Sequence, residues 1–533
     1  HPAPLVPHER VVAIEERIDP RGVQRALTPA AARQAAERVA RLEPEIVAVA
    51  LLHSYADPSH ERLLAEAIAA RLPTTDVVCS SDVLPEMREY ERTATTTCEA
   101  YVRPGVARYL ERLAERLGSL CLPPPGVVTS SGGLQTASDA ARSAASLALS
   151  GPAGGVAGAA LVARLAGVDR ALSIDIGGTS ADVGLILDGE PLVEAGGAVA
   201  GVPIALPRVL VETVSAGGGS VGWIDEGGAL RAGPRSAGAV PGPVAFGRGG
   251  SEPTVTDAHV ALGNIRPGHL SDAVRIDADA ARAAIGALAS RLGATVERTA
   301  TALIAAADAA MARALRRVSV ERGIDPRTCV LIAFGGGGPL HACGLAERLG
   351  ITRVLVPPHA GVLSALGLAV APERRLAMTS VVRTLDALDA ASLAELADDL
   401  ARRTGSGGEV AWIARLRYEG QGHELEVPFG PDVTPEALGD RFAAMHRARY
   451  GFVLDVPIEV VSARSVRSGD AREARLARQG RSPWNDREAR DDGSELDVTL
   501  TGPRTVMLSD ATMLVAPGWT ARALPFGGWE LST

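Results

Sequence analysis

The stretch that decides the fold is Ala171-Leu-Ser-Ile-Asp-Ile-Gly-Gly-Thr-Ser-Ala-Asp-Val-Gly-Leu-Ile-Leu187. Two apolar segments rich in β-branched residues flank a tight turn, a pattern that predicts a β-hairpin. Gly177 and Gly178 leave room for a phosphoryl group to approach the backbone, and their amides can form an anion nest. Thr179 and Ser180 add hydroxyl donors at the same tip. The stretch therefore predicts a phosphate-binding hairpin, and the alternative is a surface hairpin with an ordinary Gly-Gly turn.

Two carboxylates bracket this turn. Asp175 precedes the glycines and Asp182 follows them. Carboxylate oxygens are ligands that Mg²⁺ prefers, and the ion usually keeps part of its water shell. We therefore expect both residues to act as catalytic residues that hold the magnesium ion of a bound nucleotide.

Lysine is absent from the sequence, because all 54 Lys and Arg positions are Arg. A P-loop requires a Lys on the β- and γ-phosphates, and a pyridoxal-phosphate enzyme requires a Lys for its Schiff base. Both classes of protein are excluded. Any nucleotide must be bound by backbone amides, hydroxyl groups, Arg and metal.

Composition narrows the remaining classes. The net charge of −9, without an Arg-rich stripe interleaved with aromatics, argues against a general nucleic-acid binder. The five Cys are scattered without a CxxC pair, which favours reduced cytosolic thiols over a disulfide framework or a zinc site. No apolar run of about 18 residues and no signal peptide is visible, so we expect a cytoplasmic protein without a membrane span. The Ala- and Gly-rich composition favours an α/β fold with several domains.

A second glycine motif lies in Cys329-Val-Leu-Ile-Ala-Phe-Gly-Gly-Gly-Gly-Pro-Leu-His-Ala342. The order strand, four glycines, helix provides a bare turn for an adenine or an α-phosphate, and a helix N-terminus favours anions. A Rossmann site competes, but it requires GxGxxG and an acid about 20 residues further on. Residues 351–364 contain no acid, so the Rossmann site is excluded. We expect His341 at the helix start, and ATP contacts from Gly335, Gly336, Gly337 and Gly338.

A long irregular loop at 233–247 and the stretch Thr254-Val-Thr-Asp257-Ala-His259 separate the two glycine motifs. Long loops inside compact enzymes are usually functional, and the alternative is a flexible linker. The hydroxyl, charged and aromatic side chains favour the wall of a binding site. We assign Arg235, Ser236 and His259 to a substrate loop and Asp257 to the catalytic carboxylates.

Other segments outline the domains. Helices rich in small residues are predicted at 150–164 and 361–370, and we expect them to pack against each other. Strands and helices alternate over 10–120, including a helix at 104–117. The charged segment 468–496 is predicted to be a solvated or disordered loop. The predicted domains are 1–122, 123–375 and a separate C-terminal α+β module at 376–533.

The phosphate hairpin, the paired small-residue helices and the tetraglycine motif occur in the order found in the actin/hexokinase/heat-shock-chaperone ATPase superfamily. The whole chain resembles the hydantoinase A/oxoprolinase family of ATP-dependent amidohydrolase subunits and related ketone carboxylase subunits. The matching stretches are His53-Ser-Tyr-Ala-Asp-Pro-Ser-His-Glu61, Pro85-Glu-Met-Arg-Glu-Tyr-Glu-Arg-Thr93, Ser150-Gly-Pro-Ala-Gly-Gly155, 175–182, 233–242, 254–257, 334–342 and Arg417-Tyr-Glu-Gly-Gln-Gly422. The resemblance implies actin-like (ribonuclease H-like) ATPase lobes.

Two departures from the family pattern stand out. Members normally open with a first Asp-x-Gly-Gly-Thr hairpin, whereas residues 1–117 hold only Gly22 and Gly105. We therefore expect an incomplete N-terminal lobe and little ATP-dependent turnover by this chain alone. Glu99 stands where the family usually places Asn, which alters the substrate or domain-contact region.

The resemblance also implies a reaction. ATP and Mg²⁺ phosphorylate the oxygen of a cyclic amide, such as a hydantoin or 5-oxoproline, to promote ring opening; the protein mainly positions groups and stabilises charge. The implied nucleotide contacts on the hairpin are Gly177, Gly178, Thr179 and Ser180. The alternatives are a ketone carboxylase subunit with the same ATP site and a non-catalytic homologue. The expected partner is a hydantoinase B-type subunit in an oligomer, with neither nucleic acid nor membrane.

Overall fold

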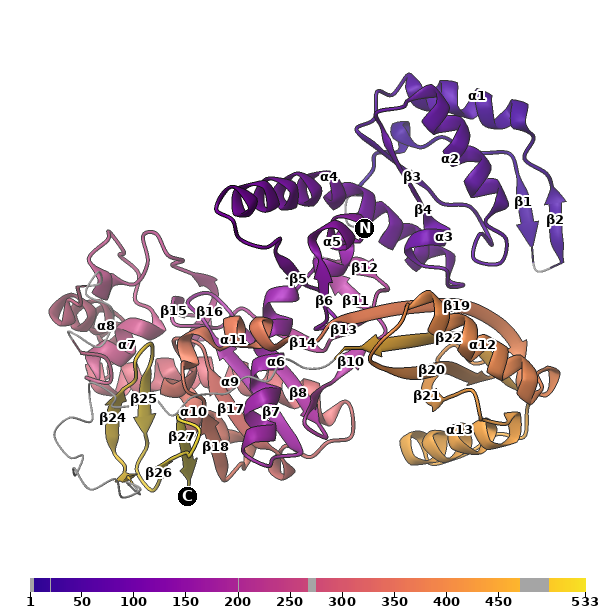
Figure 1. The fold of residues 1–533 in the computed structure, drawn as a ribbon. Helices are drawn as coiled ribbons and strands as arrows, with labels where there is room; N and C mark the ends of the chain where they lie inside the picture. The colour runs from indigo at the N-terminus through magenta and orange to yellow at the C-terminus, as the bar shows by residue number, and fades with distance from the viewer. Residues whose placement is uncertain (1–3, 20, 200, 267–274, 470–497) are drawn as a thin grey trace. The chain divides into compact units, whose positions relative to one another are not determined.

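The computed structural model describes residues 4–19, 21–199, 201–266, 275–469 and 498–533, and it divides into two compact units (Figure 1). Unit 1 comprises residues 1–150, 194–208 and 371–471, and unit 2 comprises 151–193, 209–370 and 472–533. Helices and strands mix in both units, so the predicted α/β fold class is confirmed. Most of the charged segment predicted at 468–496 lies outside the described residues.

Unit 2 is organised around a mixed sheet with the strand order β14-β8-β7-β17-β18-β27-β26-β23. The strands are β14 (Val211–Val214), β8 (Ala181–Leu187), β7 (Arg170–Ile176), β17 (Val330–Phe334), β18 (Arg353–Val356), β27 (Trp529–Ser532), β26 (Thr520–Ala523) and β23 (Thr499–Thr501). β7, β17 and β18 run parallel, whereas β8 and β27 are antiparallel to their neighbours. The apolar runs that precede the two glycine motifs therefore form the adjacent strands β7 and β17 in the sheet.

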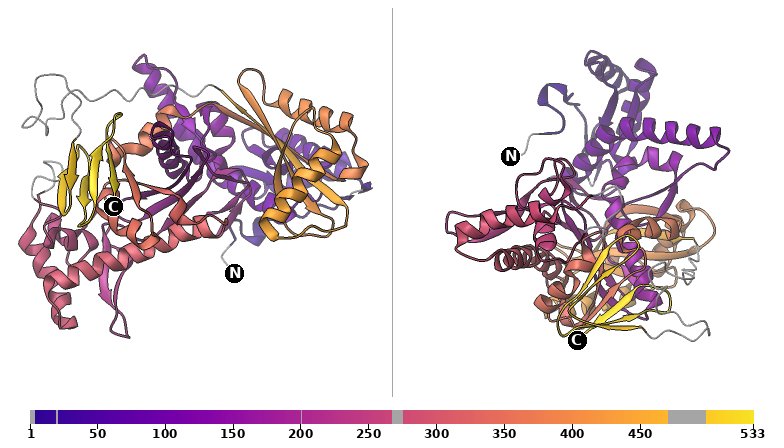
Figure 2. Two further views of the ribbon diagram at one scale, coloured as in Figure 1. Left: turned by 90° about the horizontal axis from the view of Figure 1, so that it is seen from below. Right: turned by 90° about the vertical axis from the view of Figure 1, so that its left-hand side faces the viewer.

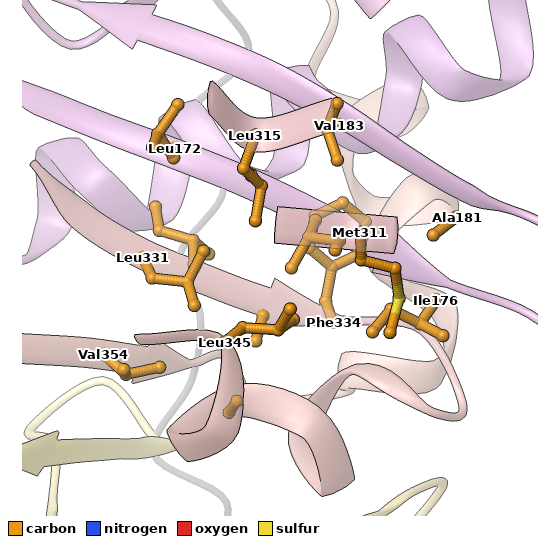
Figure 3. Packing of buried hydrophobic residues seen from close by; sticks show 14 of the residues in the cluster. Leu172, Ile176, Ala181, Val183, Met311, Leu315, Leu331, Phe334, Leu345 and Val354 are labelled. Carbon is orange, nitrogen blue, oxygen red and sulfur yellow. The ribbon is translucent and has the colours of Figure 1, made fainter. Parts of the chain in front are cut away.

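Helices α9 (Val296–Val320) and α10 (Gly338–Leu349) pack on this sheet. Figure 3 shows Met311 and Leu315 of α9 against Leu331 and Phe334 of β17, with Leu345 of α10 beside them. All five side chains are buried. Burial of apolar surface stabilises by about 25 cal/mol per Å², so this layer fixes the strand ends from which the functional loops emerge.

Strands β27, β26 and β23 from the C-terminal part of the chain complete the same sheet and are among the yellow strands in Figure 2. The buried Trp519 ties them to α10, because its indole N–H donates to Glu347 at 2.9 Å. The segment 376–533, expected as one α+β module, contributes to both units: its first part lies in unit 1 and residues from 472 onward lie in unit 2.

The two helices rich in small residues, α6 (Ser150–Leu165) and α11 (Leu363–Val370), cross within unit 2. A Cβ added at Gly367 would lie 1.9 Å from the carbonyl oxygen of Gly154, and one at Gly158 would lie 2.7 Å from that of Leu363. Only glycine permits so close an approach, and the predicted pairing of these helices is confirmed.

In unit 1 the helix α4 spans Glu89–Ser119 and runs through Pro104. The prediction that a helix starts at 104 was wrong, because the helix already begins at Glu89. A proline inside a helix destabilises it by about 3 kcal/mol. Tertiary contacts of the first half of α4 outweigh that cost. The buried Glu99 carboxylate accepts bonds from the amides of Ala144 and Ala145 and pairs with Arg103 at 2.9 Å.

Unit 1 also contains two small α/β layers. β3 (Ile46–Val49) and β4 (Asp76–Cys79) are parallel and pack with α1 (Pro29–Ala40) and α2 (Ser59–Arg71). A four-stranded antiparallel sheet has the order β19-β22-β20-β21 and packs with α12 (Ala390–Arg403) and α13 (Pro435–Tyr450). Its strands are β19 (Arg374–Thr384), β22 (Ile458–Ser468), β20 (Glu409–Tyr418) and β21 (Leu425–Phe429). Among the described residues, no helix has the length and apolar character needed to cross a membrane.

Candidate functional site

The predicted phosphate hairpin is formed by β7 and β8, with Ile176 opposite Ala181 at its tip. The turn is closed by a 3.0 Å hydrogen bond from the amide of Gly177 to the carbonyl of Ser180. The apolar side chains of both strands are buried, whereas Gly177, Gly178 and Thr179 are exposed. A rigid hairpin therefore presents a small, accessible turn of backbone.

A second glycine segment holds this turn from one side. The amide of Gly218 donates to the carbonyl of Gly177 at 3.1 Å, and the amide of Gly219 donates to that of Gly178 at 2.6 Å. A Cβ at Gly217 would lie 2.7 Å from the Gly177 oxygen, so a side chain there would push the segments apart. Because the carbonyls of the turn are engaged, its orientation is fixed. These contacts were not foreseen, since the only sequence signal was the run of three glycines.

Asp175 and Asp182 lie opposite each other across the hairpin. Thr213 donates to Asp182 at 2.5 Å, and Ser364 of α11 donates to Asp175 at 3.3 Å. Burial raises the pKa of Asp175, and the nearby charge of Asp182 raises it further. Burial also raises the pKa of Asp182, although the bond from Thr213 acts in the opposite direction. A cation between the two carboxylates would relieve both penalties.

This donor set fits the magnesium ion of a nucleotide. Asp175 and Asp182 offer hard oxygen ligands, and Mg²⁺ is typically held by one or two carboxylates together with water and substrate phosphates. Within the part of the chain that the structure describes, no three His, Cys, Asp or Glu side chains are grouped to hold a metal ion. Asp175 and Asp182 supply only two protein ligands, so the remaining ligands of a bound Mg²⁺ would come from nucleotide phosphates and water.

The tetraglycine loop meets the hairpin at Asp175. Gly335 has φ of +78°, and a Cβ there would lie 2.1 Å from the Asp175 carboxylate. The amide of Gly337 donates to the carbonyl of Ile176 at 2.9 Å, and α10 begins at Gly338 with its N-terminus at this loop. The fold thus brings residues 175–182 and 335–338 together. His341 lies in the first turn of α10, as expected.

Of the predicted substrate loop, Ser236 reaches the turn. Its Oγ is 3.4 Å from the hydroxyl of Thr179, and it accepts a bond from the amide of Gly238 at 3.1 Å. Arg235 points elsewhere and pairs with Glu252 at 2.7 Å, with both side chains largely exposed. Ser236 therefore lies at the candidate site, whereas Arg235 is engaged in a surface ion pair.

Asp257, predicted to be a catalytic carboxylate, lies in a helix cap. It is fully buried in α7 (Val255–Ala261), where it forms a capping box with Thr254. Its two oxygens accept bonds from Thr254 and from the amides of Val244 and Ala245. The four hydrogen bonds that its carboxylate accepts hold the loop to the helix.

His259 also lies inside the protein and does not face the turn. Its side chain is buried, and its Nε2 is 3.4 Å from Nε2 of His341. Burial and the neighbouring His341 lower its pKa well below the usual histidine value. The geometry therefore assigns His259 to a buried polar cluster with His341.

A carboxylate-flanked hairpin, a glycine loop at a helix start and a close-packed helix pair define a fold of the actin-like ATPase type. The comparison with known proteins is more specific. The chain belongs to the hydantoinase/oxoprolinase family: residues 92–375 match the hydantoinase/oxoprolinase domain, and residues 2–72 match the N-terminal region of that family.

Relatives by sequence include proteins of known and unknown activity. An uncharacterised protein of Methanocaldococcus jannaschii is 37% identical over 87% of this chain and 71% of its own length. The caprolactamase subunit alpha of Pseudomonas jessenii is 32% identical over 95% of this chain and 79% of the subunit. The acetone carboxylase beta subunit of Xanthobacter autotrophicus is 34% identical over 69% of this chain and 52% of the subunit.

Two solved structures are similar along nearly the whole chain. The ATP-dependent caprolactamase from Pseudomonas jessenii matches with a TM-score of 0.83 and 31% identity, covering 97% of this chain and 81% of that one. Acetone carboxylase in its nucleotide-free form matches with a TM-score of 0.73 and 25% identity, covering 99% of this chain and 82% of that one. The named activities in this set are ATP-dependent, and several of the relatives are enzyme subunits.

Proposed function

We propose that this chain is a subunit of an ATP-dependent amidohydrolase that phosphorylates a cyclic amide and so promotes its ring opening. The observation that carries the proposal is the meeting of two loops at one carboxylate: the added Cβ of Gly335 would overlap Asp175 at 2.1 Å. The phosphate turn at 177–180 and the glycine loop at 335–338 therefore lie next to each other. A ligand that is anionic at one end and flat at the other fits this arrangement.

ATP has this character. The amide of Gly177 closes the turn, so the exposed backbone of Gly178 and the hydroxyl of Thr179 offer the donors for the terminal phosphates. The N-terminus of α10 carries a partial positive charge that favours an anion, and the side-chain-free Gly336 has no other atom within 4 Å of an added Cβ. In this arrangement the β- and γ-phosphates lie at the hairpin and the adenosine lies along the glycine loop.

The chemistry follows from the weak electrophilicity of an amide. In the proposed step the γ-phosphorus bonds to the amide oxygen, its bond to the β,γ-bridging oxygen breaks, ADP leaves and the amide nitrogen loses its proton. Addition of water and expulsion of the nitrogen open the ring, and hydrolysis of the acyl phosphate releases phosphate. Asp175 and Asp182 would hold Mg²⁺, which neutralises phosphate charge when bound. The hydroxyls of Thr179 and Ser236 then orient the transferred group.

The second candidate is an ATP-dependent ketone carboxylase subunit, favoured by the likeness to acetone carboxylase with its TM-score of 0.73. Both candidates use the same nucleotide site and differ in the acceptor of the phosphoryl group. In both we expect a second, B-type subunit to complete the reaction, because relatives such as the caprolactamase alpha subunit are named as parts of larger enzymes.

ADP release by the chain combined with its B-type partner separates the candidates. We expect ADP release to depend on caprolactam, 5-oxoproline or hydantoin, and not on acetone with bicarbonate; the reverse dependence would establish the carboxylase. Asp175→Asn should lower the rate about 100-fold, a loss typical of removing one charge-stabilising group. Asp279→Asn, an exposed position in the same unit, should leave the rate unchanged. Full activity of folded Asp175→Asn would remove the hairpin from the active site.

A further inference from the structure

Unit 2 contains a buried chain of polar side chains that the proposed reaction does not use. His341 Nδ1 is 2.6 Å from the carboxylate of Asp308 on α9. His341 Nε2 faces His259 Nε2 at 3.4 Å, and His259 Nδ1 is 3.1 Å from the side-chain amide of Asn264. Both histidines are 2% exposed.

One set of tautomers satisfies the whole chain of hydrogen bonds. The Asp308 carboxylate accepts, so His341 donates from Nδ1, and in this set its Nε2 serves as an acceptor. His259 Nε2–H then donates to His341, and the bare Nδ1 of His259 accepts from the amide of Asn264. Because burial lowers the pKa of His259 well below the usual value, its ring is neutral at pH 7 and can occupy this place. Every ring nitrogen in the chain is satisfied.

Hydrogen bonds hold these buried rings beside an open space. A cavity of about 190 Å³ borders both histidines and is also lined by Asn264, Asp308 and apolar residues such as Ile304. The two rings meet edge to face, with centroids 4.9 Å apart. A ring that loses its hydrogen bond can therefore swing toward the cavity without a steric clash.

The two histidines belong to the helices that hold the two loops of the nucleotide site. The amide of Thr256 in α7 donates to the carbonyl of Gly218, and Gly218 itself donates to Gly177 in the phosphate turn. The amide of Gly337 at the start of α10 donates to Ile176. His259 and His341 each lie about one helical turn beyond these anchors. They form a direct side-chain link between α7 and α10 behind the loops.

We propose that the buried chain Asn264–His259–His341–Asp308 fixes the separation of α7 and α10 and thereby holds the phosphate turn in register with the glycine loop. His259 and His341 are then positioning residues for ATP. The inference rests on the proposed function, because it assumes that one nucleotide spans both loops. The proposal has a specific consequence. The affinity for a ligand that bridges both loops should depend on the histidine pair, whereas the affinity for a ligand that contacts one loop should not.

Calorimetric binding of Mg·ATP and of adenosine to the full chain tests this dependence. The variant His259→Phe keeps the ring but removes the donor to His341. We expect its ATP affinity to fall about tenfold, equivalent to about 1.4 kcal/mol, and its adenosine affinity to stay within about twofold. His259→Gln, which restores an N–H donor, should recover part of the ATP affinity. Ile304→Val, on the wall of the same cavity, should change neither affinity. Equal losses for ATP and adenosine would show a merely structural role and overturn the proposal.

Hydrogen exchange without nucleotide supplies a second, independent measurement. In His259→Phe the amides of Gly219 and Gly337 should exchange faster, while those of the sheet strand β17 keep their wild-type protection. Unchanged exchange at both glycines would overturn the positioning role even if ATP affinity fell. If wild-type protein binds no ATP, the proposed function fails, and the exchange result still decides whether the histidine pair holds the loops. Should His259→Phe not fold, Asp308→Asn, which keeps the acceptor but removes its charge, should show the same changes with smaller size.

Discussion

Gly335→Ala is the most direct test of how the two glycine motifs are joined. The added Cβ would lie 2.1 Å from an Asp175 carboxylate oxygen and 2.7 Å from the carbonyl oxygen of Ile176. Both neighbours are held in place, since Ile176 is a buried residue of β7. In addition, Gly335 has φ of +78°, a conformation that alanine adopts only with strain. The substitution must therefore move either the hairpin or the loop.

The expected cost combines two effects. The left-handed conformation costs about 1–2 kcal/mol for a residue with a Cβ, and overpacking a tight site costs about 1–3 kcal/mol. We expect a loss of about 3 kcal/mol in the local stability of the loop. Gly336→Ala provides the matched control, because its φ lies outside the left-handed region and no atom lies within 4 Å of the added Cβ. Its stability should remain within about 0.5 kcal/mol of wild type.

A global melting curve is a poor assay here, because a chain of two compact units need not unfold in one step. Hydrogen exchange of peptides covering 170–187 and 330–340, together with calorimetric titration of Mg·ATP, reports on the site itself. Gly335→Ala should lose protection in both peptides and lose ATP binding. Gly336→Val should keep protection and weaken only ATP binding, because its side chain enters the adenosine approach. Native protection in folded Gly335→Ala would refute the described junction of loop and hairpin.

Three further substitutions test individual carboxylates. Because the pKa of Asp175 is raised in the folded state, its ionised form opposes folding above the ordinary Asp pKa of about 3.9. Asp175→Asn should therefore increase the hydrogen-exchange protection of the peptide 170–187 at pH 7, and the gain should vanish as the pH falls toward that value. Unchanged protection at pH 7 would contradict the burial of this charge. Asp257→Asn should lower the free energy of unfolding by about 2 kcal/mol, because it weakens the capping box, and should leave the ATP affinity within about twofold of wild type. A severe loss of ATP affinity in a stable variant would support a catalytic role. Glu99→Ala should destabilise unit 1 by about 2–3 kcal/mol, since it leaves the buried amides of Ala144 and Ala145 without their acceptor, while Arg103 keeps its ion pair with Asp76. The exposed Glu111→Ala should be neutral in chemical denaturation, and equal midpoints for the two variants would show that Glu99 is dispensable.

The sequence was informative where local chemistry and fold agree. The hairpin at 171–187 combines β-branched runs with a glycine turn, and the tetraglycine motif needs a backbone without side chains, so both were recognisable from residue types alone. Asp257 is ambiguous in the sequence because Thr254-x-x-Asp257 is also the signature of a capping box, and only the structure shows that this cap forms. Likewise, a histidine at 259 cannot reveal that its partner lies at 341.

The remaining parts of the site depend on distant segments. The contacts of Gly217 and Gly219 with the turn, and of Thr213 and Ser364 with the carboxylates, join residues that no periodicity connects. Such pairings arise from sheet order and helix crossing. Pro104 is a further example, because a proline usually ends a helix. Here α4 continues past Pro104, since the buried contacts of Glu99 stabilise the helix.

The strand order of unit 2 has a consequence for synthesis of the protein. The edge of β18, at residues 353–356, is covered by β27, whose residues 529–532 are translated much later. During elongation that edge exposes unpaired backbone groups next to an apolar core that still lacks its C-terminal residues, a combination that favours aggregation. The intervening residues 371–471 belong to unit 1, which can fold before β27 is synthesised. Chaperone demand should therefore peak in this interval of translation and decline once β27 has paired.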